Sequence, residues 1–127
     1  MKSLEEIRQA HEAIRSVLNI DLTASDIIED TVSKGHKLSA LLGLSAETVA
    51  SSKRLLSEKE LTVFAENADE IKKLTPNLGL RFLKAKCFEE QELVDLSDRY
   101  NAAITHTLEL IRTTISLYKA EIGSQTK

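Results

Sequence analysis

The sequence contains few residues that interrupt or cross-link helices. It has one cysteine, one proline, four glycines and no tryptophan in 127 residues. A single cysteine, Cys87, excludes an intramolecular disulfide and a cysteine-rich metal site, and it fits a reducing compartment. No apolar run approaches the roughly 18 residues that a membrane span needs, and the N-terminus does not resemble a signal peptide. We therefore expect a cytoplasmic protein.

An excess of charge of one sign is also lacking. The chain carries 17 basic and 20 acidic side chains, a net charge of -3, and 42% of its residues are hydrophobic. Such a balance supplies a core but no broad attraction for nucleic acid or an anionic membrane. The basic pairs at 53–54 and 72–73 alternate with acids, as on solvated helix faces. We expect neither nucleic-acid binding nor membrane binding.

The apolar residues recur with a helical period, and no alternating pattern predicts a strand. A first helix is expected to begin at Ser3, where Glu6 completes a capping box. Its apolar seam consists of Leu4, Ile7, His11, Ile14 and Leu18. The 3-4 spacing of this seam keeps one face of the helix toward a partner.

Shorter helices are expected over residues 20–75. Thr23 or Ser25 would cap a second helix that ends near Gly43, and a third segment begins at Ser45. The second helix would carry Ile28, Val32, Leu38 and Leu42 toward the core. The third carries Val49, Leu56, Leu61, Phe64, Ala68, Ile71 and Leu74. Ser57 with Glu60 either splits this segment as a second capping box or lies on exposed helix surface, and both interpretations stay open.

Glycine and proline mark the expected ends of helices. Gly43, Gly79 and Gly123 each follow a periodic stretch, where a C-terminal cap belongs. Pro76 would close another stretch because it lacks the amide donor that a helix interior needs. Only Gly35 falls inside a periodic run.

The last part of the chain follows a strict 3-4 spacing. Its members are Leu80, Leu83, Cys87, Glu90, Val94, Ser97, Asn101, Ile104, Leu108, Ile111, Ile115, Tyr118 and Ile122. The pattern predicts one long helix over 78–122, with a break near Ser97 as the alternative. Together the sequence predicts a single all-α domain over 1–127. In this antiparallel helical bundle, shorter helices over 1–75 are followed by a long, coiled-coil-like C-terminal helix.

The residue types that carry chemistry do not form a recognisable constellation. No His or carboxylate stands at a convincing metal-ligand spacing from His11, His36 or His106. The four glycines cannot form a phosphate-binding loop or a dinucleotide fingerprint, and no serine lies in a nucleophile elbow. We expect a non-catalytic protein without cofactor or metal.

His36 supports a minor alternative. Residues 34–40 resemble the exposed histidine segment of histidine phosphotransfer domains, which are helical bundles. Leu38 matches the usual leucine two positions after the histidine, but Ser39 and Ala40 stand where that pattern has lysine and glycine. The resemblance implies at most a degenerate phosphotransfer domain that uses His36.

The most regular apolar stripe lies near the C-terminus, and we expect it to bind a protein partner. Its candidate partner-binding residues are Asn101, Ile104, Leu108, Ile111, Ile115 and Tyr118. Apolar residues at this spacing are those by which one amphipathic helix packs on another, and an Asn in a seam can fix the register. Small residues flank the stripe and would let a partner helix approach. The same pattern is typical of an intramolecular core, so both assignments stay open.

Two segments resemble a known family. Residues 55–75 are similar to the early helix pair of the FlgN-type flagellar export chaperones, and residues 96–118 are similar to that family's last helix. The family pattern there has two asparagines three apart, followed by leucines. Asn101 and Ile104 match the second asparagine and the first leucine, whereas Asp98 replaces the first asparagine. The resemblance covers about a third of the chain.

The resemblance implies a small cytosolic chaperone that shields an amphipathic helix of a secreted subunit until flagellar export. The binding stripe would then lie at Ile104–Tyr118, and Asn101 would set the register. The alternative is a self-associating structural or regulatory helical bundle, in which a second copy covers the stripe. The two hypotheses differ in whether the partner is another protein or a homo-oligomer.

Overall fold

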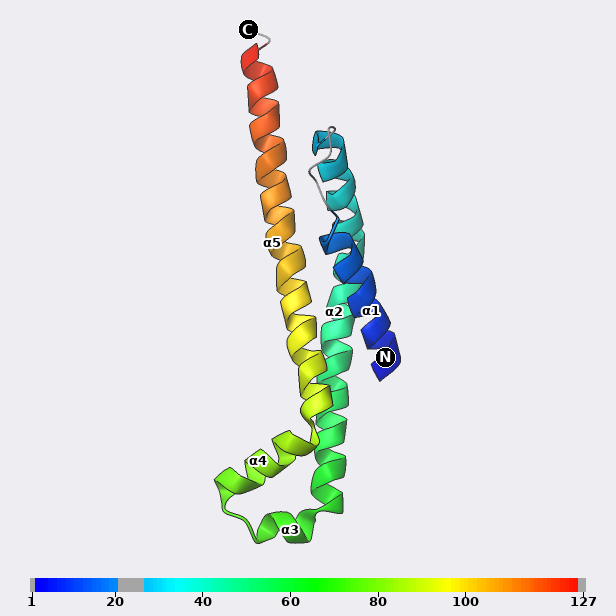
Figure 1. Ribbon diagram of the computed structural model, residues 1–127, viewed down its shortest axis with the longest axis vertical. Helices are drawn as coiled ribbons and strands as arrows, with labels where there is room; N and C mark the ends of the chain where they lie inside the picture. The colour runs from blue at the N-terminus through cyan, green and yellow to red at the C-terminus, as the bar shows by residue number, and fades with distance from the viewer. Residues whose placement is uncertain (1, 21–26, 126–127) are drawn as a thin grey trace.

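The computed structural model describes residues 2–20 and 27–125, and these are almost entirely helical (Figure 1). The helices are α1 (Leu4–Leu18), α2 (Ile27–Glu66), α3 (Ala68–Lys72), α4 (Pro76–Lys86) and α5 (Phe88–Gln125). No strand occurs in these two ranges. The all-α prediction is confirmed.

Two long antiparallel helices, α2 and α5, form the frame of the molecule (Figure 1). They contain 40 and 38 residues, or about 60 Å of helix each at 1.5 Å per residue. Helix α1 lies along the middle of this hairpin and packs on both long helices. The short helices α3 and α4 form an angular turn at one end, which we call the elbow (Figure 1). Three helices therefore pack together over only part of the length of the bundle.

Helix α1 begins where the sequence predicts. The Ser3 hydroxyl accepts a hydrogen bond from the Glu6 backbone N–H and donates one to the Glu6 carboxylate. Ile7, His11 and Ile14 are buried, and Ala10 joins them. The predicted seam is therefore the face that packs on the hairpin.

Helix α2 contradicts the prediction of separate shorter helices. It continues through Gly43, Ser45 and Ser57 without a break, and it ends at Glu66. Gly43 lies in a helix interior, where it costs about 1 kcal/mol relative to alanine. The packing of α2 along α5, the largest contact between any two helices, outweighs this cost. The expected caps Thr23 and Ser25 lie outside the described residues.

The buried face of α2 also differs from the predicted one. Val32 and Leu42, predicted to face the core, are exposed, whereas Leu38 is fully buried. The buried residues are Thr31, Lys34, Leu38, Ser45, Thr48, Ser51, Ser52 and Val63. Most of them follow one 3-4 spacing along the helix, and several are small and polar. Small side chains allow two helices to approach closely, which an all-leucine seam would not.

The long C-terminal helix begins ten residues later than predicted. Cys87 separates α4 from α5, and its N–H bonds to the carbonyls of Leu83 and Lys84. Pro76 begins α4 rather than closing a helix, and Thr75 caps it. Gly79 lies inside α4, and a Cβ placed on it would lie 3.5 Å from Ile71. That distance is an ordinary van der Waals contact, so α4 packs beside α3 at Gly79 and Ile71, and the chain then bends at Cys87 to enter α5.

Helix α5 is continuous from Phe88 to Gln125, so the alternative of a break near Ser97 is wrong. Gly123 lies inside it and not at a cap. The predicted seam is buried or half-buried from Cys87 to Ile115. One core cluster joins all three main helices and consists of Ile14, Leu38, Ile104, Leu108 and Ile111.

Candidate functional site

The predicted partner-binding stripe of α5 divides into an inner and an outer part. Ile104 is fully buried, and Leu108 and Ile111 are each 6% exposed. These three residues pack with Ile14 of α1 and Leu38 of α2. The inner part of the stripe therefore belongs to the core of the folded chain, where another protein does not reach it.

The outer part of the stripe lies on the surface. Ile115 is half-buried against the core cluster, Tyr118 is 42% exposed and Ile122 is exposed too. Leu117 is 63% exposed on another side of α5. Helix α5 extends beyond the first turn of α2 at this end of the hairpin, as Figure 1 shows. We call Ile115, Tyr118 and Ile122 the distal face of α5.

Asn101 sets a register within the chain. Its side-chain oxygen accepts a hydrogen bond of 2.9 Å from the Ser45 hydroxyl of α2. Gly35 lies ten residues before Ser45, and Ile111 lies ten after Asn101; a Cβ at Gly35 would lie 3.2 Å from Ile111. These two contacts share one antiparallel register of α2 against α5. The seam asparagine thus aligns two helices of the same chain.

A polar band crosses the middle of the bundle beside this pair. The hydroxyls of Thr48 and Ser52 donate to carbonyls of their own helix, those of Leu44 and Val49. Ser51 accepts a hydrogen bond from the backbone N–H of Lys2. No buried side-chain nitrogen or oxygen atom of the described residues lacks a hydrogen-bond partner. The band is therefore satisfied internally, and its chemistry is that of helix packing.

His11 lies at the edge of the polar band. Its Nε2 atom is 2.8 Å from the Ser97 hydroxyl, and Ser97 donates its single hydrogen to the carbonyl of Leu93. Because that hydrogen is already used, His11 Nε2 must carry the proton and donate to Ser97. The imidazole also contacts Tyr100, with ring centroids 5.2 Å apart. Burial lowers the pKa of His11 below its ordinary value.

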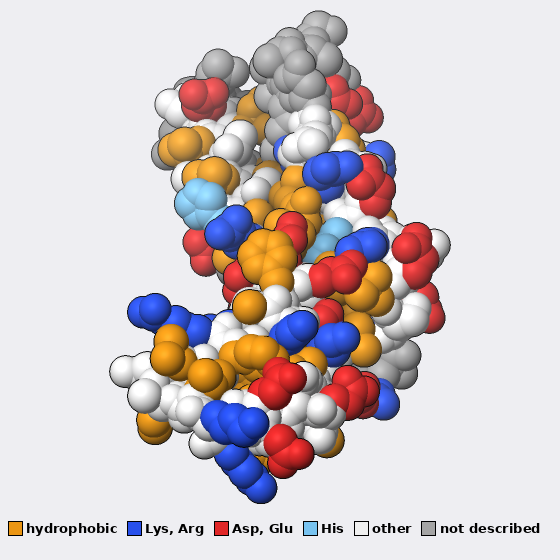
Figure 2. Space-filling model, turned by 60° about the horizontal axis from the view of Figure 1, so that its bottom comes forward, with side chains coloured by type: hydrophobic (Ala, Val, Ile, Leu, Met, Phe, Trp, Pro, Cys, Tyr) orange, Lys and Arg blue, Asp and Glu red, His pale blue; other side chains and the backbone are white. Residues whose placement is uncertain are grey.

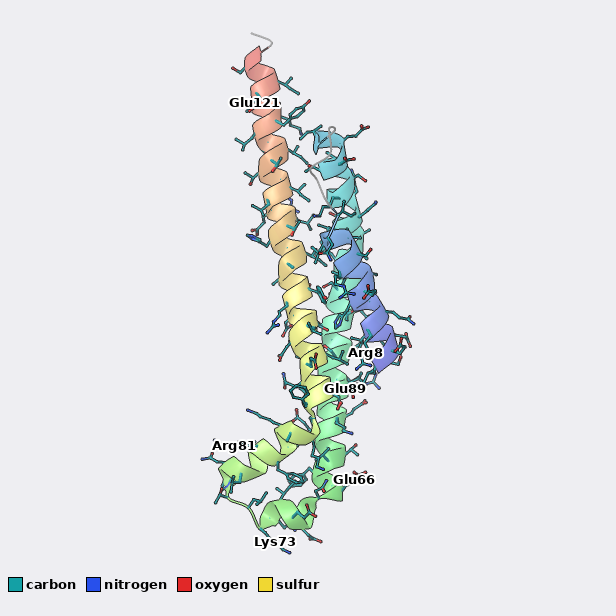
Figure 3. All side chains as sticks on the ribbon, in the orientation of Figure 1. Arg8, Glu66, Lys73, Arg81, Glu89 and Glu121 are labelled. Atoms are coloured by element: carbon teal, nitrogen blue, oxygen red, sulfur yellow. The ribbon has the colours of Figure 1, made fainter. Side chains whose placement is uncertain are left out.

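Charged residues surround a hollow over His11, between α1 and α5. Arg8 of α1 and Glu89 of α5 form an ion pair across its rim (Figure 3), and Arg15 pairs with Glu12. This pair lowers the pKa of Glu12 and raises that of Arg15. The hollow measures about 300 Å³ and is also lined by Glu92, Leu93, Leu96 and Tyr100. The Arg8–Glu89 pair joins α1 to α5, whereas the Arg15–Glu12 pair lies within α1.

Cys87 and His36 complete the candidates from the sequence. Cys87 is buried, and its burial, together with Glu60 and Glu90, raises the pKa of the thiol. A thiol of this kind stays protonated and packs as a small hydrophobe. His36 is exposed on α2. The neighbouring Lys34 points inward and donates to the carbonyls of Leu18 and Ile20.

Sequence reasoning missed the surface of the elbow. Leu61 is 72% exposed, and Phe64, Leu78, Leu80 and Phe88 are exposed as well. The predicted seam had placed Leu61 and Phe64 in the core. The change of helical phase between Leu56 and Leu61, visible in the sequence, is the signal that these residues leave the buried face.

Comparisons with known proteins leave the family open. No family model, curated protein or solved structure matches the chain. Within the described ranges, no group of three or more metal-binding side chains comes together. No helix there is both long and apolar enough to cross a membrane. The function is therefore inferred from the surfaces of the chain itself.

Proposed function

We propose that this protein is a non-catalytic, cytoplasmic helix-binding protein. The distal face of α5 would cover an amphipathic helix of another protein, as an export chaperone shields a secreted subunit. The observation that carries this proposal is the continuation of the core stripe onto the surface at Ile115, Tyr118 and Ile122. The same spacing that packs α5 on α1 and α2 thereby presents an apolar edge to a further helix.

A residue that flanks this edge favours burial by a partner. The Thr114 hydroxyl, next to Tyr118 on the helix surface, donates to the Leu110 carbonyl. Because this hydroxyl is satisfied within α5, covering it does not leave an unpaired polar group, which would cost about 1–3 kcal/mol. An exposed apolar stripe on a secreted helix is prone to aggregation, and covering it would prevent that.

The FlgN-type resemblance of residues 96–118 supports the same end of the molecule. It implies a binding stripe from Ile104 to Tyr118, of which the core already occupies Ile104, Leu108 and Ile111. The proposal therefore moves the contact outward, to the distal face. The competing hypothesis, self-association, would use the same residues with a second copy as the partner.

Affinity capture from the cytosol of the native cell tests this function. The bait is compared with a Tyr118→Asp/Ile122→Asp variant and with a Thr113→Asp/Ala120→Asp control. The control adds the same charge on the opposite side of α5, where both residues are exposed. We expect the wild type and the control to retain one protein whose amphipathic helix, made as a peptide, also binds. Recovery of the bait alone, or equal capture by the distal-face variant, contradicts the proposal.

A further inference from the structure

The elbow carries an apolar groove at the opposite end of the hairpin from the distal face (Figure 1). Two hollows of about 110 and 410 Å³ adjoin there and share Glu60 and Leu83. Their apolar lining comes from two helices: Leu56, Leu61 and Phe64 of α2, and Leu80 and Leu83 of α4. Figure 2 shows hydrophobic side chains gathered across this end of the molecule. A groove with walls from two helices has the form that accepts a third.

The charge of the elbow differs from that of the rest of the chain. The elbow's first turn, in α3, carries Asp69 and Glu70, but residues 71–88 contain five basic side chains and no acidic one, in a chain whose net charge is -3. These are Lys72, Lys73, Arg81, Lys84 and Lys86, all exposed. Lys84 lines the groove. Figure 2 shows basic side chains on several sides of the apolar surface.

The opposite wall of the groove is acidic. Glu60 of α2 lines both hollows, and Glu58 and Glu66 are exposed on the same helix. A helix in the groove would thus meet basic groups along α4 and a carboxylate along α2. This asymmetry fixes both the charge and the direction of the edge that faces α4.

The geometry points to an amphipathic helix of a partner protein as the occupant of the groove, with its apolar stripe on Leu61, Phe64 and Leu83 and an acidic edge toward Lys84 and the other exposed basic residues of α4. A second copy of the chain fits less well, because a symmetric contact through two elbows would bring the two basic segments together. A lipid surface fits less well too. It would contact the rim rather than the groove, and the acidic groups of α2 would repel anionic headgroups.

This surface is independent of the distal face of α5, which lies at the other end of the hairpin. The proposed function depends on Ile115, Tyr118 and Ile122. The inference about the elbow depends on residues of α2 and α4. One partner could use both ends, or two partners could bind at once. The two inferences are therefore tested with different variants.

Fluorescence anisotropy with two synthetic helical peptides tests the elbow. Both peptides carry leucine at positions i, i+3, i+4, i+7 and i+11 and neutral glutamine on one flank, and the other flank is glutamate in one peptide and lysine in the other. We expect the glutamate peptide to bind about tenfold more tightly than the lysine peptide, with an affinity that falls as salt is added. The full-length protein is used throughout.

Three variants locate the binding. Arg81→Glu/Lys84→Glu should lower the affinity for the glutamate peptide about tenfold and reverse the preference between the two peptides. Leu61→Ser/Phe64→Ser should weaken both, since both side chains are exposed and the fold does not depend on them. Lys37→Glu/Arg112→Glu makes the same charge change on exposed parts of α2 and α5 away from the groove and should bind as the wild type does. Circular dichroism checks that each variant retains its helix content.

Several results would overturn the inference. Equal affinity for the two peptides, or an affinity that the Arg81→Glu/Lys84→Glu change leaves unaltered, excludes a preference for a partner helix with an acidic edge. Binding to phosphatidylglycerol vesicles without peptide binding assigns the elbow to a membrane. A dimer in light scattering that the elbow variants dissociate assigns it to a second copy. The Tyr118→Asp/Ile122→Asp variant should bind the peptide as the wild type does. The elbow is therefore tested even if the distal face binds no partner.

Discussion

The Nε2 atom of His11 on α1 lies 2.8 Å from the hydroxyl of Ser97 on α5. Ser97 donates its hydroxyl hydrogen bond to the carbonyl of Leu93. The neutral imidazole is therefore held in the tautomer that carries its proton on Nε2. This short chain of donors ties α1 to the long hairpin at a point where the core is polar. It makes the attachment of α1 sensitive to protonation of one side chain.

We predict that stability falls as the pH drops below about 6.5, the ordinary pKa of histidine. Burial lowers the pKa of His11 in the folded chain. The unfolded chain therefore binds more protons than the folded chain between that lowered pKa and 6.5, and acid favours unfolding. Stability from this group is complete above 6.5 and declines until the pH reaches the folded pKa. Urea unfolding at pH 5.5 and 7.5 measures the difference.

A His11→Gln variant serves as the control for this pH effect. The glutamine amide can still donate to Ser97, but it does not titrate. The variant should lose a clear part of the pH dependence between 7.5 and 5.5. An unchanged dependence would contradict the assignment of the effect to His11.

The division of the α5 stripe predicts two different responses to truncation. Leu108→Ala should reduce the free energy of unfolding by about 2–5 kcal/mol, because it leaves a cavity in the core cluster. Ile122→Ala should change it by less than about 0.5 kcal/mol, because Ile122 is 43% exposed on the surface. Chemical denaturation of both variants checks this. Similar losses at the two positions would contradict the placement of the stripe.

The two glycines of α2 should respond differently to alanine. Gly43 has no atom within 4 Å of a built Cβ, whereas a Cβ at Gly35 would lie 3.2 Å from Ile111. Gly43→Ala should therefore raise the melting temperature, with about 1 kcal/mol gained from helix propensity. Gly35→Ala should gain less, since Ile111 must move. Destabilisation by Gly43→Ala would indicate that α2 is interrupted there.

We predict that Lys34 stabilises the contact between α1 and α2. Its ammonium group donates to the carbonyls of Leu18 and Ile20 near the end of α1, where a cation also complements the helix dipole. Lys34→Met should preserve the aliphatic packing but lose these bonds, at a cost of about 1–3 kcal/mol. Amide exchange of α1 should accelerate more than that of α5. Equal acceleration in both helices would mean that Lys34 supports the whole bundle.

The strength of the sequence pattern explains which parts of the fold could be predicted. The α1 cap at Ser3 and the seam from Cys87 to Ile115 follow from local spacing, and both agree with the structure. The continuity of α2 did not follow from apolar residues alone, because its middle is buried through Ser45, Thr48 and Ser52. These residues continue the 3-4 spacing of Leu38, but hydroxyl side chains are as common at caps as in close helix contacts.

The elbow and the outer stripe depend on long-range contacts that the spacing does not encode. The bend at Cys87 allows α4 to pack on Ile71 through Gly79, a contact between helices of different sequence phase. Ile111 and Ile115 belong to one stripe in the sequence, yet only packing by α1 and α2 buries the first more deeply than the second. The sequence thus locates the candidate partner-binding site on one face of α5. Only the fold shows that the outer end of that face is the accessible part.

Photo-crosslinking at position 118 tests the central claim most directly. Tyr118 lies on the distal face and is 42% exposed, so p-benzoylphenylalanine can replace it without disturbing the core. Irradiation in the living cell should join this position to an amphipathic helix of a different protein, and the same probe at the opposite-face residue Ala120 should give little product. A crosslink only to a second copy of the chain, or equal yields at both positions, would contradict the account.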